Sequence, residues 1–319
     1  MTIKFAGSRI GLTGRPGADD RFERFERVEG ITADRGPVAV TARVQGIKAG
    51  EWRVTAIPVR QESVRAGTSR KTKFRPTVST HRTRLATLVY GPAVRLATWP
   101  ALVGVGAVAA IAVQAILLGR EDLNVVAAVV ISVVACLVGN VGARIWCLAL
   151  HRKHPRHFLT VGACIQGFLL GAVGALAIGA AAFRLPLGAL LDATAPGIYL
   201  GMAIGRPGCF FTGCCAGRPT SSRWGVWSSD RRVAIRRFPV QLVEAAVALV
   251  IGVAALALVL GVQPPVRGAV FVGALSAYTF CRQLLFPLRT ESRTRLGRLL
   301  TMVACGLLFV ASAGTFAMS

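Results

Sequence analysis

The C-terminal part of the chain is dominated by apolar segments long enough to cross a lipid bilayer. A helix needs about 20 predominantly apolar residues to span the hydrocarbon core. Beyond Leu96 such segments cover residues 99–118, 123–150, 158–183, 187–205, 239–262, 266–286 and 299–318. Lipid cannot satisfy free backbone groups, so these segments must fold as helices. The pattern predicts an all-α polytopic membrane protein with about seven transmembrane helices.

Composition supports this class and excludes others. Hydrophobic residues make up 53% of the chain and charged residues 16%, with a mean hydropathy of +0.56, which is unusual for a soluble domain. The net charge of +24 indicates an anionic partner. A nucleic-acid-binding protein should not carry several long apolar runs, so we expect acidic lipid as the partner and no nucleic acid. Residues 1–35 lack the apolar core of a signal peptide, so we expect the later helices to drive insertion.

The N-terminal region divides into three parts. Residues 1–36 are polar and without period, and are expected to be disordered. Residues 37–60 alternate apolar and other side chains on both sides of a glycine-containing turn, which predicts a β-hairpin. Residues 61–95 are basic and rich in Ser and Thr, and are interpreted as a solvated linker, with attraction to acidic headgroups as the alternative. Residues 96–319 are expected to form the transmembrane domain.

Several ionisable and polar residues interrupt the apolar segments. Each ionisable group costs about 2.5–3.5 kcal/mol at a helix centre, so such residues are functional candidates. The ionisable ones are Arg144, Asp192, Arg206, Glu244 and Arg282, and the amides and phenol that accompany them are Asn140, Gln166, Gln241 and Tyr278. The excess of arginine predicts a polar chamber that receives an anion, and a guanidinium group matches a phosphate well. Helical spacing places Tyr278 beside Arg282 and Gln241 beside Glu244.

A Gly- and Cys-rich stretch, GRPGCFFTGCCAGRPT, runs from Gly205 to Thr220 directly after the fourth apolar segment. We expect irregular backbone that lines a polar cavity, in which glycines bring N–H groups close to a ligand. Its C-x4-C-C spacing is not a common zinc pattern, so no metal site is expected there. The five cysteines outside this stretch are interpreted as small buried hydrophobic residues.

The stretch and two later elements resemble a known family. GRPGCFFTGCCAGRPT, then RFPVQLVEA at residues 237–245, then Tyr278 and Arg282 in a Y-x3-R arrangement, resemble the prolipoprotein diacylglyceryl transferases. The resemblance covers roughly residues 130–290 and is closest to a branch whose signature is G-R-x-G-C-F-x-x-G-C-C-x-G. It implies transfer of the diacylglyceryl group of phosphatidylglycerol to the thiol of a lipobox cysteine in a prolipoprotein, releasing glycerol phosphate. It further implies a multi-pass protein of the bacterial plasma membrane that needs no cofactor.

The resemblance also implies roles for individual residues. Arg206 and Arg282 hold the phosphate as catalytic residues, and Tyr278 orients it. The residues implied in substrate binding are Arg144, Gln166, Gly167, Cys209, Gly213, Gly217, Gln241 and Glu244.

Departures from the family pattern keep two other functions open. Gln166-Gly167-Phe168 stands where better-known members have His-Gly-Gly, Cys209 and Cys214 stand where they have Asn and Glu, and Phe286 replaces an expected acid. One alternative is a non-catalytic phospholipid-binding or accessory relative in lipoprotein biogenesis. The other is a thiol redox or metal protein that uses Cys209, Cys214 and Cys215.

The orientation in the membrane has two conflicting indicators. The N-terminal region and the basic loops at residues 151–157, 218–237 and 289–298 fall on one side, which the positive-inside rule makes cytoplasmic. The family resemblance places the signature loop outside, where a prolipoprotein arrives. We expect the family placement, since arginines that serve the site and contact headgroups account for part of the loop charge.

Overall fold

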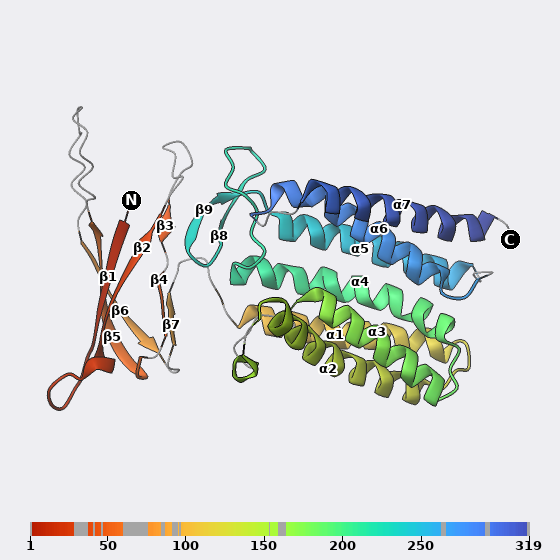
Figure 1. Ribbon diagram of the computed structural model, residues 1–319, viewed down its shortest axis with the longest axis horizontal. Helices are drawn as coiled ribbons and strands as arrows, with labels where there is room; N and C mark the ends of the chain where they lie inside the picture. The colour runs from red at the N-terminus through yellow and green to blue at the C-terminus, as the bar shows by residue number, and fades with distance from the viewer. Residues whose placement is uncertain are drawn as a thin grey trace. The chain divides into compact units, whose positions relative to one another are not determined.

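The chain forms two compact units, one rich in strands and one helical (Figure 1). The computed structural model describes residues 2–28, 38–40, 42–45, 47–59, 76–83, 87–90, 95, 97–152, 154–158, 164–262, 266–290 and 294–317. The first unit comprises Met1–Trp99, Cys209–Gln241 and Leu288–Thr290, and the second comprises Pro100–Gly208, Leu242–Pro287 and Glu291–Ser319. The segment 209–241, expected within the transmembrane domain, belongs to the strand-rich unit because its second strand pairs with residues 39–40.

The described residues contain seven α-helices. They are α1 Thr98–Gly119, α2 Val125–Leu150, α3 Ile165–Ala182, α4 Leu187–Thr212, α5 Val240–Gly261, α6 Ala269–Leu285 and α7 Arg295–Ala317. All except α3 are long and apolar enough to cross a membrane, and α3 is a shorter apolar helix. The predicted polytopic helical class is therefore confirmed, and six of the seven predicted spans are candidate membrane spans in the described residues.

Helix α4 differs from the sequence expectation at its C-terminal end. It continues through Pro196 and Pro207 to Thr212, although residues 205–212 were expected to be irregular. A proline forfeits one backbone hydrogen bond, and helices in membranes tolerate this because neighbouring groups compensate. Irregular backbone begins only at Gly213, whose φ of +75° is accessible to glycine at little cost. Arg206 therefore lies inside a helix, which fixes the direction of its side chain.

Small residues allow the helices to approach closely. A Cβ atom at Gly106 of α1 would collide with the carbonyl oxygen of Gly201 in α4, and one at Gly142 of α2 would lie 2.6 Å from the carbonyl oxygen of Gly167 in α3. Lipid provides no hydrophobic force between helices, so close backbone contact and interhelical hydrogen bonds hold such bundles together.

Buried hydrogen bonds connect three helices of the bundle. Gln114 of α1 is almost fully buried, and its Nε2 donates to Thr194 Oγ1 of α4 at 2.6 Å. Ser132 of α2 donates from Oγ to Gln114 Oε1 at 2.7 Å. The single amide thus joins both neighbours, and its donor and acceptor are both used.

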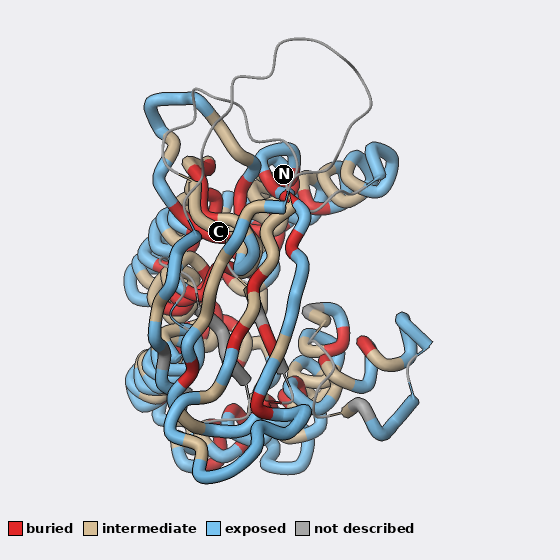
Figure 2. The backbone as a smooth tube through the Cα atoms, turned by 90° about the vertical axis from the view of Figure 1, so that its left-hand side faces the viewer, coloured by how far each residue is buried: buried red, intermediate tan, exposed pale blue. Residues whose placement is uncertain are grey.

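The described part of the strand-rich unit contains three antiparallel sheets. Their strands are β1 Thr2–Arg9, β2 Arg21–Arg27, β3 Ala39–Val40, β4 Ala42–Gln45, β5 Gly50–Val59, β6 Thr77–Thr83, β7 Thr87–Tyr90, β8 Val226–Ser229 and β9 Val233–Arg237. The strand orders are β2-β1-β5-β6, β3-β9-β8 and β4-β7. Trp52 is fully buried with Val44 and Ile47, and its ring lies 5.6 Å from that of Phe22. Figure 2 shows short buried segments alternating with exposed ones along the strands.

Three expectations for the N-terminal region require correction. Disorder in residues 1–36 is wrong for the described residues 2–28, because β1 pairs with both β2 and β5. Lys4 Nζ lies 2.7 Å from Glu23 on β2, and Arg9 Nε lies 2.8 Å from Asp20, which directly precedes β2. The hairpin at residues 37–60 contains the predicted strands but not the predicted pairing. Strand β4 pairs with β7, whereas β5 pairs with β1 and β6.

The expected linker also contains strands, β6 and β7, in its described residues 76–83 and 87–90. Its basic residues Arg70, Lys71, Lys73 and Arg75 lie outside the described part of the chain.

The contact between α1 and α4 generates a stability prediction. We expect Gly106→Ala to lower the free energy of unfolding by about 1–3 kcal/mol, because the new methyl group overlaps the Gly201 carbonyl. Gly104→Ala is the matched control, since no atom lies within 4 Å of its added Cβ. Alanine favours a helix over glycine by up to about 1 kcal/mol, so this variant should be unchanged or slightly stabilised. Thermal unfolding in detergent measures both, and equal effects would contradict the close contact.

Candidate functional site

Four polar side chains from three helices meet inside the helical unit. Arg206 of α4 places Nη1 3.1 Å from Glu244 Oε2 of α5, and its Nη2 donates to the Tyr278 hydroxyl of α6 at 3.3 Å. Arg282, one turn after Tyr278, places Nε 3.6 Å from Glu244 Oε1. Each carboxylate oxygen of Glu244 thus faces a different guanidinium group. We call these four residues the arginine cluster.

Helix position explains why these residues converge. Arg206 lies near the C-terminal end of α4, Glu244 near the N-terminal end of α5, and Tyr278 and Arg282 near the C-terminal end of α6. Consecutive helices run in opposite directions through the bundle. The C-terminal ends of α4 and α6 and the N-terminal end of α5 therefore lie at the same end of it, and all four side chains come from there. The ring of Tyr199, about two helical turns before Arg206, lies 5.5 Å from that of Tyr278 and packs beside the cluster.

Burial within the arginine cluster is graded. The side chain of Glu244 is only 1% exposed, whereas those of Arg206 and Arg282 are 14% and 22% exposed. Two guanidinium groups and one carboxylate give these four residues a positive formal charge. Guanidinium groups present planar forks of N–H donors that fit phosphate oxygens. The arrangement is therefore chemically suited to bind a phosphate group.

The strand-rich unit contains most of the Cys-rich stretch. After α4 ends, Gly213 and Cys215 both have positive φ, +75° and +54°, and the chain turns sharply between them. The fully buried Gln241 donates from Nε2 to the Cys214 carbonyl oxygen at 2.9 Å. A Cβ atom at Gly217 would collide with the Phe238 carbonyl oxygen, so only glycine fits there. We call residues 213–237 the signature loop.

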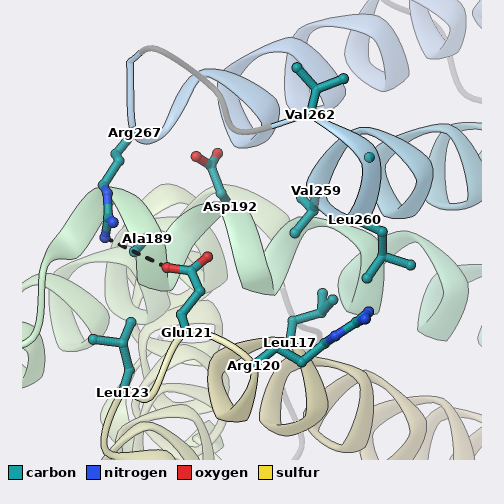
Figure 3. A pocket seen from close by; sticks show the side chains of 11 residues that line it. Leu117, Arg120, Glu121, Leu123, Ala189, Asp192, Val259, Leu260, Val262 and Arg267 are labelled. Atoms are coloured by element: carbon teal, nitrogen blue, oxygen red, sulfur yellow. Dashed lines mark ion pairs between the residues drawn. The ribbon is translucent and has the colours of Figure 1, made fainter.

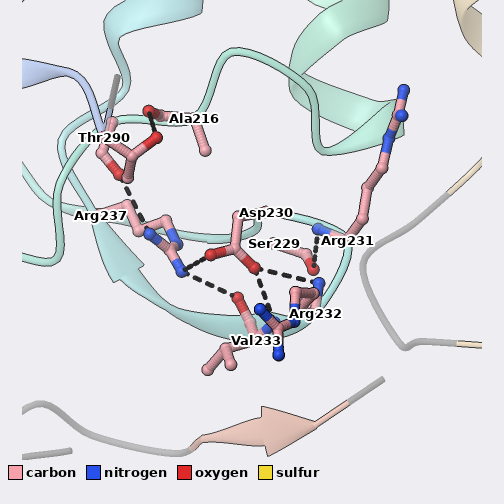
Figure 4. A network of polar contacts seen from close by, with 9 residues as sticks. Ala216, Ser229, Asp230, Arg231, Arg232, Val233, Arg237 and Thr290 are labelled. Carbon is pink, nitrogen blue, oxygen red and sulfur yellow. Dashed lines mark hydrogen bonds and ion pairs between the residues drawn. The ribbon is translucent and has the colours of Figure 1, made fainter. Parts of the chain in front are cut away.

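Arg237 organises the signature loop from its interior (Figure 4). It is 3% exposed, and its Nη2 donates to Asp230 Oδ2 at 2.6 Å and to the Val233 carbonyl at 3.2 Å, while Nη1 donates to the Gly217 carbonyl at 3.2 Å. Burial lowers the pKa of Arg237 and the Asp230 carboxylate opposes this effect. Sequence reasoning missed this pair, although Asp230 stands out as the sole acid in the basic sequence from residue 218 to 237.

The structure places the sequence-predicted site residues in three locations. Arg206, Glu244, Tyr278 and Arg282 form the arginine cluster, whereas Cys209, Gly213, Gly217 and Gln241 belong to the strand-rich unit.

The third location is the α2–α3 contact. The Arg144 guanidinium lies 5.5 Å from the centre of the Phe158 ring, Gln166 is exposed, and the backbone of buried Gly167 lies against Gly142 and Trp146. The described contacts do not join these three residues to the arginine cluster, and their role in substrate binding stays a prediction.

Asp192 lies at the opposite end of α4 and has a structural role (Figure 3). Its Oδ2 accepts from the Gly268 N–H at 2.6 Å and its Oδ1 from the Phe271 N–H at 2.9 Å, so it caps the start of α6. A rise of 1.5 Å per residue separates it from Arg206 by about 21 Å along the helix. The interpretation that Asp192 joins the arginines in one chamber is therefore wrong. It lines a separate cavity of about 520 Å³, where Arg267 pairs with Glu121 at 3.6 Å.

These features define a polytopic membrane protein whose helices bring two arginines, a glutamate and a tyrosine together at one end of the bundle. Residues 87–318 match the profile of the family described as prolipoprotein diacylglyceryl transferase. Because this match covers most of the chain and all seven helices, the chain belongs to that family.

Individual relatives align over shorter segments. A phosphatidylglycerol–prolipoprotein diacylglyceryl transferase of a Nostoc species is 35% identical over 97 residues, which is 30% of this chain and 32% of the relative. The second such enzyme of Streptomyces coelicolor is 54% identical over 57 residues, 18% of each chain. That of Trichormus variabilis is 36% identical over 80 residues, 24% of this chain and 28% of the relative. The alignments thus span about a third or less of these relatives.

The shared carboxylate generates a prediction on stability. We expect Glu244→Gln to lower the free energy of unfolding by about 3 kcal/mol, because it removes the charge of a buried carboxylate that faces two partly buried guanidinium groups. Glu121→Gln is the control, since Glu121 forms an exposed ion pair with Arg267 that contributes about 1 kcal/mol or less. Thermal unfolding in detergent compares them. An effect of Glu244→Gln no larger than that of the control would contradict the shared-carboxylate arrangement.

The cysteines of the strand-rich unit generate a prediction on reactivity. Hydrogen bonding with Cys209 and Cys215, together with burial, raises the pKa of the Cys214 thiol well above its ordinary value. A higher pKa means less thiolate at any given pH, and only the thiolate is alkylated readily. At pH 8 we expect iodoacetamide to modify Cys214 at least about tenfold more slowly than a thiol introduced by Ser222→Cys on the exposed loop. Peptide mass spectrometry measures both rates, and equal rates would contradict the shift.

Proposed function

We propose that this protein transfers the diacylglyceryl group of phosphatidylglycerol to the thiol of a lipobox cysteine in a prolipoprotein, releasing glycerol phosphate. The observation that carries the proposal is the arginine cluster, found in a chain of the prolipoprotein diacylglyceryl transferase family. A phospholipid is the natural phosphate-bearing ligand for a cation held at the end of a membrane-spanning bundle. Its headgroup lies at the bilayer surface while its acyl chains extend along the helices.

Arg206 and Arg282 both stabilise the leaving phosphate in the proposed reaction. The thiol sulfur forms a bond to the glycerol carbon of the diacylglyceryl group, the carbon–oxygen bond to phosphate breaks, and the phosphate oxygen keeps the electron pair. The thiol proton ends on the released glycerol phosphate, directly or through water, so atoms and charge balance. Negative charge therefore grows on the leaving phosphate, and guanidinium groups already oriented toward it stabilise the transition state more than the ground state.

Glu244 and Tyr278 act as positioning residues in this proposal. The carboxylate of Glu244 contacts both guanidinium groups, at 3.1 and 3.6 Å, and so fixes their separation before the lipid arrives. The Tyr278 hydroxyl accepts from Arg206 and fixes the orientation of its fork. Such preorganisation avoids the cost of ordering flexible side chains during the reaction.

The proposed setting is the bacterial plasma membrane, with phosphatidylglycerol drawn from the bilayer and the acceptor presented by a prolipoprotein signal peptide. The bacterial origin of the relatives named above and the candidate membrane spans support it. The proposal places the strand-rich unit with its signature loop on the outer side, where secreted prolipoproteins emerge. A tag at residue 1 that is reached only from the cytoplasm would overturn this orientation.

Complementation of a bacterial strain that lacks its own transferase tests the proposed function. We expect the wild-type chain to restore lipidation of a reporter prolipoprotein, and Arg206→Ala and Arg282→Ala each to reduce it about 100-fold, since loss of one charge-stabilising donor has this effect in other enzymes. Arg267→Ala is the control, because Arg267 belongs to the separate cavity near Asp192.

Failure of the wild-type chain to lipidate, with normal membrane insertion, would refute the transferase function. Retained binding of phosphatidylglycerol vesicles would then identify the chain as a non-catalytic lipid-binding relative, the alternative suggested by Gln166 and Phe286.

A further inference from the structure

We propose that Cys147, His151 and Cys164 form a binding site for a thiophilic metal ion of the Zn²⁺ class. The three residues lie at the contact between the C-terminal end of α2 and the start of α3. Each offers one ligand atom, and the three atoms all lie within 4.8 Å of one another. The site shares no residue with the arginine cluster or the signature loop, and its existence does not depend on the proposed transferase activity.

The spacing on α2 brings two ligands together. Cys147 and His151 are four residues apart, so they lie on one face of the last helical turn. His151 Nδ1 is 3.5 Å from Cys147 Sγ. A tetrahedral Zn²⁺ ion with bonds of 2.3 Å to sulfur and 2.0–2.1 Å to nitrogen separates these two ligand atoms by about 3.6 Å. The existing separation therefore already matches one edge of the coordination tetrahedron.

Cys164 is fixed against the same helix from another segment of the chain. Its backbone N–H donates to the Ala143 carbonyl oxygen of α2 at 3.1 Å, and Cys164 itself is the N-cap residue of α3. This bond holds the third ligand one helical turn from Cys147. The two sulfur atoms need only a small rotation about their side-chain bonds to reach the separation of about 3.8 Å that two thiolates adopt on one zinc ion.

The chemistry of the donors selects the metal. Two thiols and one imidazole prefer Zn²⁺ or other soft ions over Mg²⁺ and Ca²⁺, which prefer oxygen ligands. Binding converts both thiols to thiolates and releases their protons to solvent, which the exposed His151 allows. His151 Nδ1 also lies 2.9 Å from the Cys147 carbonyl oxygen, which can only accept a hydrogen bond, so metal binding at Nδ1 replaces this bond and leaves the ring proton on Nε2. Three protein ligands leave the fourth position of the tetrahedron to water.

The second group of thiols, Cys209, Cys214 and Cys215, provides an internal comparison. Its three sulfur atoms also lie within 4.8 Å of one another, but it contains no imidazole. An imidazole binds Zn²⁺ as the neutral ring, whereas every thiol must lose a proton to bind, so the mixed group needs one deprotonation fewer than the three-thiol group. We therefore assign the metal to the mixed nitrogen–sulfur site.

Metal titration of the full-length protein in detergent tests the proposal. Protein stripped with a chelator is titrated with Co²⁺, whose thiolate charge-transfer absorption reports sulfur ligands, and then with Zn²⁺, with bound metal counted by elemental analysis. We expect one ion per chain and displacement of Co²⁺ by Zn²⁺. Cys147→Ser, His151→Asn and Cys164→Ser should each weaken binding at least about tenfold, and the two cysteine variants should lower the charge-transfer band.

Two variants serve as controls. Cys136→Ser alters a thiol of the same helix outside the site, and Cys214→Ser alters the second thiol group. Neither should change the stoichiometry or the affinity. The proposal is overturned if the wild-type chain binds no metal at stoichiometric level, or if Cys214→Ser abolishes binding while His151→Asn and Cys164→Ser do not. Because His151 is exposed, its variant should fold normally, and thermal unfolding without metal verifies this.

Discussion

The carboxylate of Glu244, held between two guanidinium groups, is the interaction on which the functional interpretation depends. Without it, Arg206 and Arg282 would repel each other at the end of a membrane-embedded bundle. With it, both guanidinium groups are held beside one carboxylate. One buried acid thereby allows α4, α5 and α6 to pack together with two arginines at their shared end, and the proposed function uses these arginines to bind a phosphate.

Close helix packing is the condition for this geometry. Glycines such as Gly106 and Gly201 let backbones touch, Gln114 links α1 to α2 and α4, and Asp192 caps α6 from α4. None of these contacts touches the arginine cluster. Each nevertheless restricts the sliding or rotation of a helix that carries one of its residues, and a shift of about 1 Å in a site of this kind has large effects on binding and catalysis.

The sequence was sufficient to predict the helices and most of the arginine cluster, because hydropathy and helical spacing are local signals. Tyr278 and Arg282 lie on one face whatever the tertiary structure is. Strand pairing was not predictable, since alternation identifies β4 and β5 but not their partners, and β9 pairs with a strand almost 200 residues earlier in the chain. Asp192 was grouped with the arginines in one chamber because its charge, rather than its position along α4, guided the interpretation.

Direct observation of group transfer by the purified protein tests the central claim. The protein in lipid nanodiscs is supplied with phosphatidylglycerol labelled in the diacylglyceryl part and with a peptide that contains a lipobox cysteine. The account predicts that the label becomes attached to the peptide thiol and that glycerol phosphate is released in equal amount. Labelled lipid that stays intact beside an unmodified peptide, or a labelled peptide without released glycerol phosphate, would contradict it.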